Sequence, residues 1–269
     1  MANTSINKAD TAPLLETFDG PVCRLTLNRP TARNALSSEL IDALQCAFDR
    51  LATNRNIKVI LLDGAGEGFC SGHDLKEVRA LNDETAIAQL FDDCARMMQS
   101  IGTLPQPVIA LVHGVATAAG CQLVASADLA LATEEARFAT PGVHIGLFCS
   151  TPMVPLTRTV SKKHAMEMLL TGELVSAEDA ERIGLINRVV PADRLQAEGD
   201  ALAAKIAEKS NYTIGLGKKT FYEQYDMPIG DAYAHCCAVM TRNMMAPDAA
   251  EGIDAFLEKR PPDWRGDIT

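Results

Sequence analysis

Short runs of apolar residues, separated by polar loops, dominate the first two thirds of the chain. Cys23, Leu25 and Leu27 alternate with polar residues, which is typical of a half-buried strand that ends near Pro30. Three continuous apolar runs predict strands buried on both faces, at residues 59–62, 107–112 and 129–132. Because loops and helix-like stretches lie between these strands, the pattern predicts an α/β fold.

Helical periodicity appears early and then dominates the end of the chain. Ser37 is a suitable N-cap for a helix that carries Leu40, Leu44 and Phe48 on one face. Further helices are expected at about 85–101 and, toward the end, at about 195–209, 230–245 and 247–259. The last part of the chain is therefore expected to form a helical region, whereas residues 1–13 resemble a loose polar start.

Composition and charge narrow the class of protein. The chain has 269 residues and is 47% hydrophobic, so it can bury a sizeable core. Its net charge of -10 argues against nucleic acid as a partner, and any anionic ligand needs a local basic cluster. Eight cysteines without a CxxC pair predict reduced thiols, and no apolar run reaches membrane-spanning length. We expect no membrane partner and a cytoplasmic location, although a processed organellar protein gives the same pattern.

Two loops of small residues, at 68–77 and 113–122, each follow a predicted strand and lead into a predicted helix start. Small residues let the backbone approach a ligand, and the first N–H groups of a helix have no internal acceptor. Two such N–H groups aimed at one point can bind the oxygen of a thioester as it becomes an enolate. On these residues alone, tight turns that serve only packing are the better explanation of the loops, because small-residue loops after strands are common.

An ordered set of segments resembles the crotonase (enoyl-CoA hydratase/isomerase) superfamily from about residue 14 to the end. These segments are NRP at 28–30 and RNAL at 33–36, FCSGHDL at 69–75, HG at 113–114 with GC at 120–121, ADL at 127–129, FATP at 138–141 with Gly146, LTG at 170–172 with Ala177, Ala180 and GLI at 184–186, and FLEKR at 256–260. The resemblance implies a spiral of ββα units at residues 14–195 and a helical region at 196–269. That region would assemble trimers, often paired into hexamers.

The same resemblance implies a binding site for an acyl-CoA thioester, as in fatty acid metabolism, and no cofactor beyond the CoA of the substrate. The backbone N–H groups of His73 and Ala119 would form the oxyanion hole. Other residues would line the substrate site: Ala32, Arg33 and Ala35 near the CoA nucleotide, Asp74, Leu75, Lys76 and Gly120 near the thioester, and Phe256 and Lys259 on the terminal helix of this or a neighbouring subunit. No metal is expected.

The chain departs from the family at both of its usual catalytic glutamates, because Gln122 and Gly142 stand at those positions. An amide cannot serve as a general base and glycine has no side chain, so hydration should lose much of the about 10²–10⁴ in rate that one positioned acid–base group contributes, and more with both groups gone. His144 is a replacement candidate, and Cys149 and Ser150 are weaker ones, although each also fits a packing role.

Three functions remain open at the level of sequence. The first is a hydratase-like or isomerase-like enzyme in which Gln122 and His144 adapt the chemistry. The second is a decarboxylase-type lyase, because residues 71–74 resemble the corresponding loop of methylmalonyl-CoA decarboxylase, where a histidine also stands at the oxyanion position. The third is a noncatalytic acyl-CoA-binding protein. Asp74 is expected to cap the following helix, and Glu134 and Glu135 to lie in a solvated turn.

Overall fold

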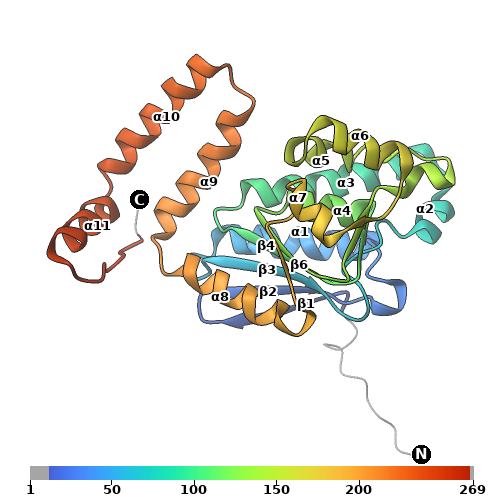
Figure 1. The fold of residues 1–269 in the computed structure, drawn as a ribbon, viewed down its shortest axis with the longest axis horizontal. Coiled ribbons are helices and arrows are strands. Elements are labelled where there is room, and N and C mark those ends of the chain that lie inside the picture. Colours follow the sequence, from blue (N-terminus) through green and yellow to red (C-terminus); the bar gives the residue numbers. More distant parts are fainter. Residues whose placement is uncertain (1–11, 267–269) are drawn as a thin grey trace, which may run out of the picture.

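A six-stranded sheet is the central layer of the protein (Figure 1). The computed structural model describes residues 12–266. Nearly all of the expected polar start at residues 1–13 lies outside the described residues. The strand order is β1-β2-β3-β4-β6-β9, in which β1 is antiparallel to β2 and every other neighbouring pair is parallel. The strands are β1 (Leu14–Asp19), β2 (Val22–Leu27), β3 (Val59–Gly64), β4 (Val108–Val112), β6 (Leu129–Thr133) and β9 (Arg188–Val190). The predicted α/β class is confirmed.

Helices cover both faces of this sheet, which explains why its inner strands are apolar without alternation. Ile60 and Leu62 belong to one buried cluster with helices α1 (Ser38–Thr53) and α3 (Glu84–Thr103). Leu61 faces the other way and packs with helix α8 (Leu195–Ala207). The predicted helix start at Ser37 is also confirmed, because its hydroxyl accepts a hydrogen bond from the N–H of Leu40 at 3.3 Å.

A small second sheet gives the chain its repeated ββα units. Its strands are β5 (Val115–Thr117), β7 (Arg137–Ala139) and β8 (Val175–Ser176), in the order β5-β7-β8. One unit runs from β4 through β5 into helix α4 (Ala119–Ser126), and another runs from β6 through β7 into the 3-10 turn η3 (Pro141–Ile145). Glu134 and Glu135 are exposed in the turn between β6 and β7, as expected. The spiral of ββα units is confirmed.

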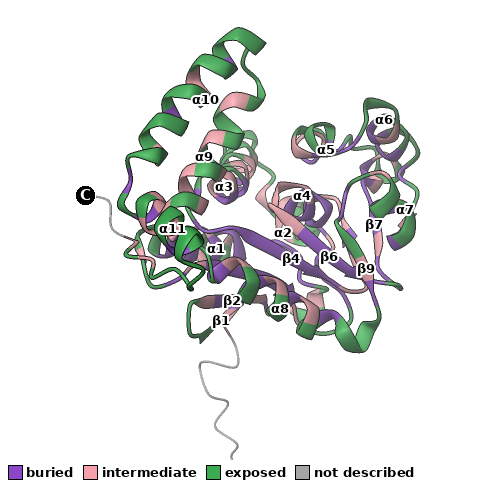
Figure 2. Cartoon of the chain, turned by 60° about the vertical axis from the view of Figure 1, so that its left-hand side comes forward, coloured by how far each residue is buried: buried purple, intermediate pink, exposed green. Residues whose placement is uncertain are grey.

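The remaining helices divide between the core and a projecting arm. Helices α2 (Leu75–Leu81), α5 (Met153–Thr159), α6 (Lys162–Thr171), α7 (Ala177–Arg182) and α8 belong to the body, whereas α9 (Asn211–Tyr225), α10 (Ile229–Met244) and α11 (Pro247–Glu258) form the arm (Figure 1). The expected boundary at residue 195 falls at the start of α8, which packs on the sheet. Figure 2 shows that α10 is largely exposed while the sheet is buried.

A buried ion pair between Lys218 of α9 and Asp128 of the body connects the arm to the body. The Lys218 ammonium on α9 donates to the Asp128 carboxylate at 2.6 Å and to the carbonyl oxygens of Ile101 and Gln106 at 2.7 and 2.9 Å. Tyr222 donates to the other Asp128 oxygen at 2.9 Å. The Lys218 side chain is only 6% exposed, so these contacts replace most of the water that its charge loses.

Candidate functional site

The two small-residue loops lie directly against each other. The N–H of Cys70 donates to the Val115 carbonyl at 3.1 Å, and the N–H of Thr117 donates back to the Cys70 carbonyl at 2.9 Å. Gly120 then passes so close that a Cβ there would lie 2.0 Å from the Cys70 oxygen. Glycine is therefore required at position 120, and it allows the start of α4 to lie beside the first loop.

The backbone N–H groups of His73 and Ala119 have no hydrogen-bond acceptor within residues 12–266. Neighbouring groups of the first loop are paired, since Leu36 donates to the Gly72 carbonyl at 2.7 Å and Asp74 donates to the Leu36 carbonyl at 2.9 Å. A Cβ on Gly72 would lie 3.3 Å from the Ala119 nitrogen, so the two unpaired groups come from touching segments. This arrangement can serve as an oxyanion hole.

The residue between β5 and α4 is held in an unfavourable backbone conformation. Ala118 has φ 51° and ψ -118°, a region that residues with a Cβ rarely adopt. Its N–H donates to the Ala139 carbonyl at 2.9 Å, which fixes this turn to the neighbouring strand β7. Such strain costs about 1–3 kcal/mol and is found where a turn must present a group accurately. Here the turn presents the Ala119 N–H.

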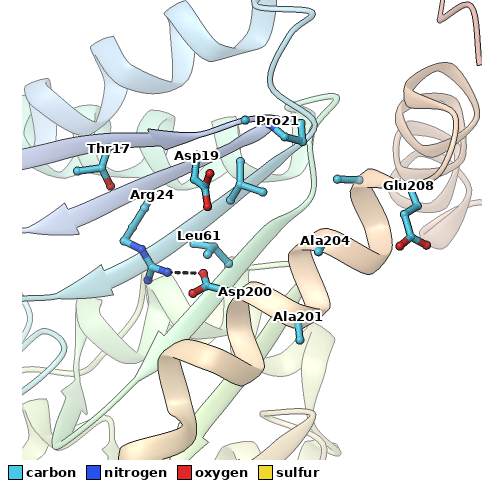
Figure 3. A pocket seen from close by; sticks show the side chains of 12 residues that line it. Thr17, Asp19, Pro21, Arg24, Leu61, Asp200, Ala201, Ala204 and Glu208 are labelled. Atoms are coloured by element: carbon cyan, nitrogen blue, oxygen red, sulfur yellow. Dashed lines mark hydrogen bonds and ion pairs between the residues drawn. The ribbon is translucent and has the colours of Figure 1, made fainter.

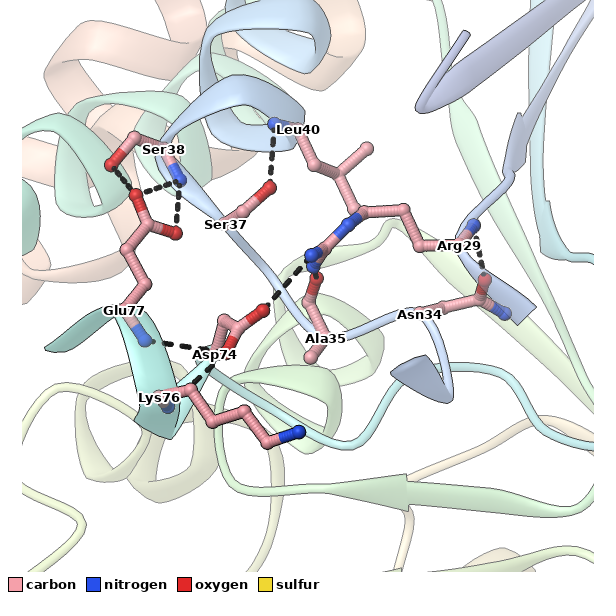
Figure 4. A network of polar contacts seen from close by, with 9 residues as sticks. All are labelled: Arg29, Asn34, Ala35, Ser37, Ser38, Leu40, Asp74, Lys76 and Glu77. Carbon is pink, nitrogen blue, oxygen red and sulfur yellow. Dashed lines mark hydrogen bonds and ion pairs between the residues drawn. The ribbon is translucent and has the colours of Figure 1, made fainter. Parts of the chain in front are cut away.

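A polar network holds the start of α2 in place (Figure 4). As expected, Asp74 caps this helix by accepting from the N–H groups of Lys76 and Glu77 at 3.2 and 3.4 Å. Its other oxygen forms an ion pair with Arg29 at 2.9 Å, and this guanidinium contact holds the pKa of the carboxyl below its ordinary value. Glu77 accepts from the N–H of Ser38 at 3.1 Å, so α2 is tied to the start of α1.

Arg29 and Asn34 are positioning residues that the sequence argument did not identify. Asn34 is fully buried, accepts from the N–H of Arg29 at 2.9 Å and donates to the carbonyls of Ala65 and Gly68 at 2.8 Å. These bonds join the segment after β2 to the first loop. Two polar residues in a short turn could have indicated a structural hydrogen-bond network. The sequence does not reveal which distant residues they bind.

The imidazole of His73 is largely buried, although the residue as a whole is partly exposed. It packs edge-on against Phe91 of α3 with ring centroids 5.1 Å apart, and its Nε2 is buried without a partner among the described residues. Burial lowers the pKa of His73 below its ordinary value, so the ring is neutral near pH 7. The histidine therefore brings no positive charge to this site.

The two positions that lack glutamate have different surroundings. Gln122 lies on the first turn of α4, is only 4% exposed and has an unpaired Oε1. Gly142 is enclosed, because a Cβ there would lie 2.9 Å from the Leu147 carbonyl oxygen and 3.0 Å from the Cys149 sulfur. Burial raises the pKa of the Cys149 thiol, which is therefore neutral near pH 7 and a poor base.

Each of the three replacement candidates has a different neighbour in the described part of the chain. The His144 Nε2 lies 3.2 Å from the Gly172 carbonyl at the end of α6, so its ring has a structural partner. Ser150 is exposed, and its hydroxyl donates to the Phe148 carbonyl at 3.4 Å. Cys149 is the one that lies against Gly142. Their catalytic roles remain predictions.

The expected CoA-binding residues separate into two groups. The first group lies beside the first loop, because the Arg33 carbonyl accepts from the N–H of Ser71 at 3.1 Å. It comprises Ala32 at the end of the turn η2 (Pro30–Ala32), Arg33 and Ala35, together with the exposed Leu75 and Lys76. Phe256 and Lys259 are exposed on α11, across the molecule from α2 (Figure 1). One chain alone does not bring these two groups together.

A cavity of about 760 Å³ lies elsewhere, between strands β1 to β3 and α8 (Figure 3). Arg24 crosses it to bind Asp200 at 2.6 Å and also contacts Asp63 at 2.8 Å. This cavity opens on the α8 face of the sheet, whereas α4 packs in the cluster on the other face. It is therefore separate from the two loops. Within residues 12–266, no helix is both long and apolar enough to cross a membrane.

The fold and the paired loops define a class of protein, and comparison with known proteins agrees. The family model described as enoyl-CoA hydratase/isomerase matches residues 17–267, and the chain belongs to this family. The expected resemblance to the crotonase superfamily is thus confirmed.

Individual relatives make the relationship more specific. The chain is 47% identical over 241 residues to the enoyl-CoA hydratase domain-containing protein 3, mitochondrial, of Xenopus laevis, covering 90% of this chain and 82% of that protein. The crystal structure of the human protein of that name aligns with a TM-score of 0.91 at 44% identity, covering 94% and 100% of the two chains. An enoyl-CoA hydratase of Mycobacterium smegmatis aligns with a TM-score of 0.92 at 50% identity, covering 94% and 98%.

Proposed function

We propose that this protein binds an acyl-CoA thioester and stabilises its enolate form through the backbone N–H groups of His73 and Ala119. The observation that carries this proposal is the pair of unpaired N–H groups on two loops in contact. The family name and the names of the relatives, which refer to enoyl-CoA, support the thioester as ligand. In general, one such donor contributes about 2.7–4 kcal/mol to barrier lowering.

The reaction is one that does not depend on a carboxylate base. Gln122 cannot take a proton near neutral pH, and Gly142 is enclosed by Cys149 and the Leu147 carbonyl. Classical hydration of an enoyl-CoA is therefore expected to be slow. Decarboxylation of a carboxyacyl-CoA is the second candidate, because loss of CO2 produces the enolate without removal of a C–H proton. The neutral, enclosed His73 is compatible with this route.

The test combines binding with turnover. Wild-type protein should bind butyryl-CoA more tightly than CoA by calorimetry, and crotonyl-CoA hydration should be weak in a spectrophotometric assay. Methylmalonyl-CoA, assayed for CO2 release, tests the second candidate. Ala119→Pro removes one N–H at the first residue of α4, so any turnover found should fall by about 10²–10³. A thermal melt checks folding, because proline also restricts the strained Ala118 before it.

Each outcome of this test decides between the functions. Tight thioester binding without turnover would support the noncatalytic alternative, and rapid hydration of crotonyl-CoA by the wild type would contradict the argument from Gln122 and Gly142. Failure to prefer butyryl-CoA over CoA would exclude the proposed site itself.

The cellular location is part of the proposal. Five vertebrate relatives carry the word mitochondrial in their names, which supports the organellar alternative over the expected cytoplasmic location. We propose an organellar, mitochondrial location, and imaging of a tagged protein tests it.

A further inference from the structure

A second cavity, of about 440 Å³, lies at the edge of the sheet where the parallel strands β3 and β4 begin. Lys58 lies directly before β3 and Gln106 lies two residues before β4, and both line this cavity. The two small-residue loops instead follow these strands at the opposite edge, and strands of this length span about 17–20 Å. The cavity is therefore separate from the proposed thioester site, and its volume lies within the range of about 300–1,000 Å³ that small-molecule sites occupy.

Positive charge gathers in this cavity, although the whole chain carries a net charge of -10. No aspartate or glutamate of residues 12–266 lines it, whereas Arg55, Lys58 and Arg265 do. The Lys58 ammonium donates to the Ala207 carbonyl at 2.9 Å and forms no ion pair with a described carboxylate. The local basic cluster that an anionic ligand requires is thus present here.

Arg265 is a cation that remains available to such a ligand. Its N–H donates to the Asp248 carboxylate at 2.9 Å, which fixes the backbone, while its guanidinium has no hydrogen-bond or ion-pair partner within residues 12–266. The Glu251 carboxylate interacts with Arg265 only at longer range and is itself paired with Arg260 at 2.6 Å. A guanidinium in this state matches a phosphate group, because it can donate two parallel N–H bonds to two phosphate oxygens.

The rest of the lining adds two aromatic rings and an unpaired acceptor. Tyr212 and Trp264 line the cavity, and the indole N–H of Trp264 donates to the Glu208 carbonyl at 2.7 Å, which orients its ring. Gln106 is only 5% exposed and its Nε2 donates to the Leu51 carbonyl at 2.6 Å, whereas its Oε1 is buried and accepts from no described residue. Because a buried acceptor without a donor is rare, this oxygen indicates a ligand that brings an N–H or O–H group.

The cavity lies where the arm leaves the body (Figure 1). The lining segments at 54–58 and 105–106 belong to the body, whereas those at 211–214 and 264–266 begin α9 and follow α11. A ligand that contacts both sides binds only the docked arrangement of the arm and therefore stabilises it.

We propose that this cavity is a second binding site, for a nucleoside monophosphate whose base carries an amino group. The phosphate binds Arg265 and Lys58, the base stacks on Tyr212 or Trp264, and the amino group donates to Oε1 of Gln106. The bound nucleotide joins the arm to the body and thereby regulates how firmly the arm is docked. This site is independent of the proposed thioester site.

The experiment measures dissociation constants for the full-length protein by calorimetry, with AMP, ribose 5-phosphate, adenosine and IMP. AMP should bind about tenfold more tightly than each of the other three, because they lack the base, the phosphate and the amino group respectively. Arg265→Gln should weaken AMP binding about tenfold through loss of the guanidinium. The matched control is Arg182→Gln, because Arg182 is an exposed residue on α7 that does not line the cavity.

A second readout follows the arm itself. AMP should slow proteolytic cleavage of the arm in the wild type and in Arg182→Gln, but not in Arg265→Gln, whose folding circular dichroism verifies. Saturating butyryl-CoA should leave the affinity for AMP unchanged, because the two sites lie at opposite edges of the sheet.

Four results would overturn the inference. These are AMP binding no tighter than ribose 5-phosphate, an AMP affinity that Arg265→Gln leaves intact, displacement of AMP by butyryl-CoA, and cleavage of the arm at the same rate with and without AMP. None of the four bears on whether the thioester binds at His73 and Ala119, so the proposed function stands or falls by its own test.

Discussion

At the scale of single residues, the close packing around Gly142 predicts that a larger side chain there lowers the stability of the protein. The Cα of Gly142 faces the Leu147 carbonyl and the Cys149 sulfur at distances that leave no room for a Cβ. Gly142→Glu should therefore destabilise the protein by about 1–3 kcal/mol through overpacking. Together with Gln122→Glu, it should also fail to produce rapid hydration of crotonyl-CoA, because the loop at 147–149 must move first.

Urea unfolding and a crotonyl-CoA assay check both parts of this prediction. Gly217→Ala is the matched control, because its Cβ would enter open space on α9 and its effect should be neutral or slightly stabilising. A stable, rapidly hydrating double variant would show that the loop around Gly142 adapts freely.

The enclosed His73 predicts a specific dependence of stability on pH. Its pKa is lowered in the folded protein, so below the ordinary histidine value of about 6.5 the unfolded chain binds more protons than the folded one. The free energy of unfolding should therefore fall as the pH drops from about 7.5 to about 5.5, and this loss should be smaller in His73→Leu. Urea unfolding at both pH values measures it, and an equal loss in the two proteins would contradict the burial argument.

The sequence was informative about single residues wherever the cause is local. The N-caps at Ser37 and Asp74 depend on residues within one turn and were predicted. By contrast, the pairing of Arg29 with Asp74 and the contact of Cys149 with Gly142 join positions that only the folded chain brings together. The oxyanion-hole positions came from family resemblance and stay a prediction, which the unpaired N–H groups of His73 and Ala119 support.

At the scale of elements, the strands were easier to predict than the arm. Continuous apolar runs specify β3, β4 and β6 because both faces of the sheet are covered. Helix α9 was missed, since Gly215 and Gly217 interrupt its pattern and none of its residues is fully buried. Its order comes instead from docking to the body through Lys218 and Tyr222, which helical periodicity does not reveal.

Lys218 should therefore be the residue on which docking of α9 depends most. Lys218→Met leaves the Asp128 carboxylate partly buried without its cation, and removing one partner of such a pair costs about 3–5 kcal/mol. Lys219→Met is the control, because the Lys219 side chain is 71% exposed and its pair with Glu223 contributes little. Thermal melting measures the stability, and limited proteolysis should cut the arm of Lys218→Met first. Equal melting of both variants would mean that other contacts suffice for docking.

At the scale of the whole molecule, the arm presents large apolar side chains to solvent. Met245, Ile229 and Phe256 are 82%, 77% and 83% exposed, which is unusual for a surface that remains free. We predict that the protein assembles as a homotrimer or hexamer through this arm. Light scattering after size-exclusion chromatography should give three or six times the 28.9 kDa chain mass.

A charged substitution on the arm provides the control for assembly. Ile229→Glu at the start of α10 should lower the measured mass, whereas Phe18→Glu, at an exposed apolar residue on β1 outside the arm, should not. A mass of one chain for the wild type would contradict assembly. Phe256 and Lys259 would then have no role in binding CoA, because they lie far from the first loop of their own chain.

The close packing around Gly142 also has a historical consequence. A loop that has folded onto residue 142 penalises a glutamate there, so a lineage with this loop should regain a working acid at this position only together with a change in the loop. The glycine and the closed loop are therefore coupled, because a side chain at residue 142 requires the loop to move. A relative that carries an acid at the corresponding position should therefore show a different arrangement of the loop that corresponds to residues 147–149.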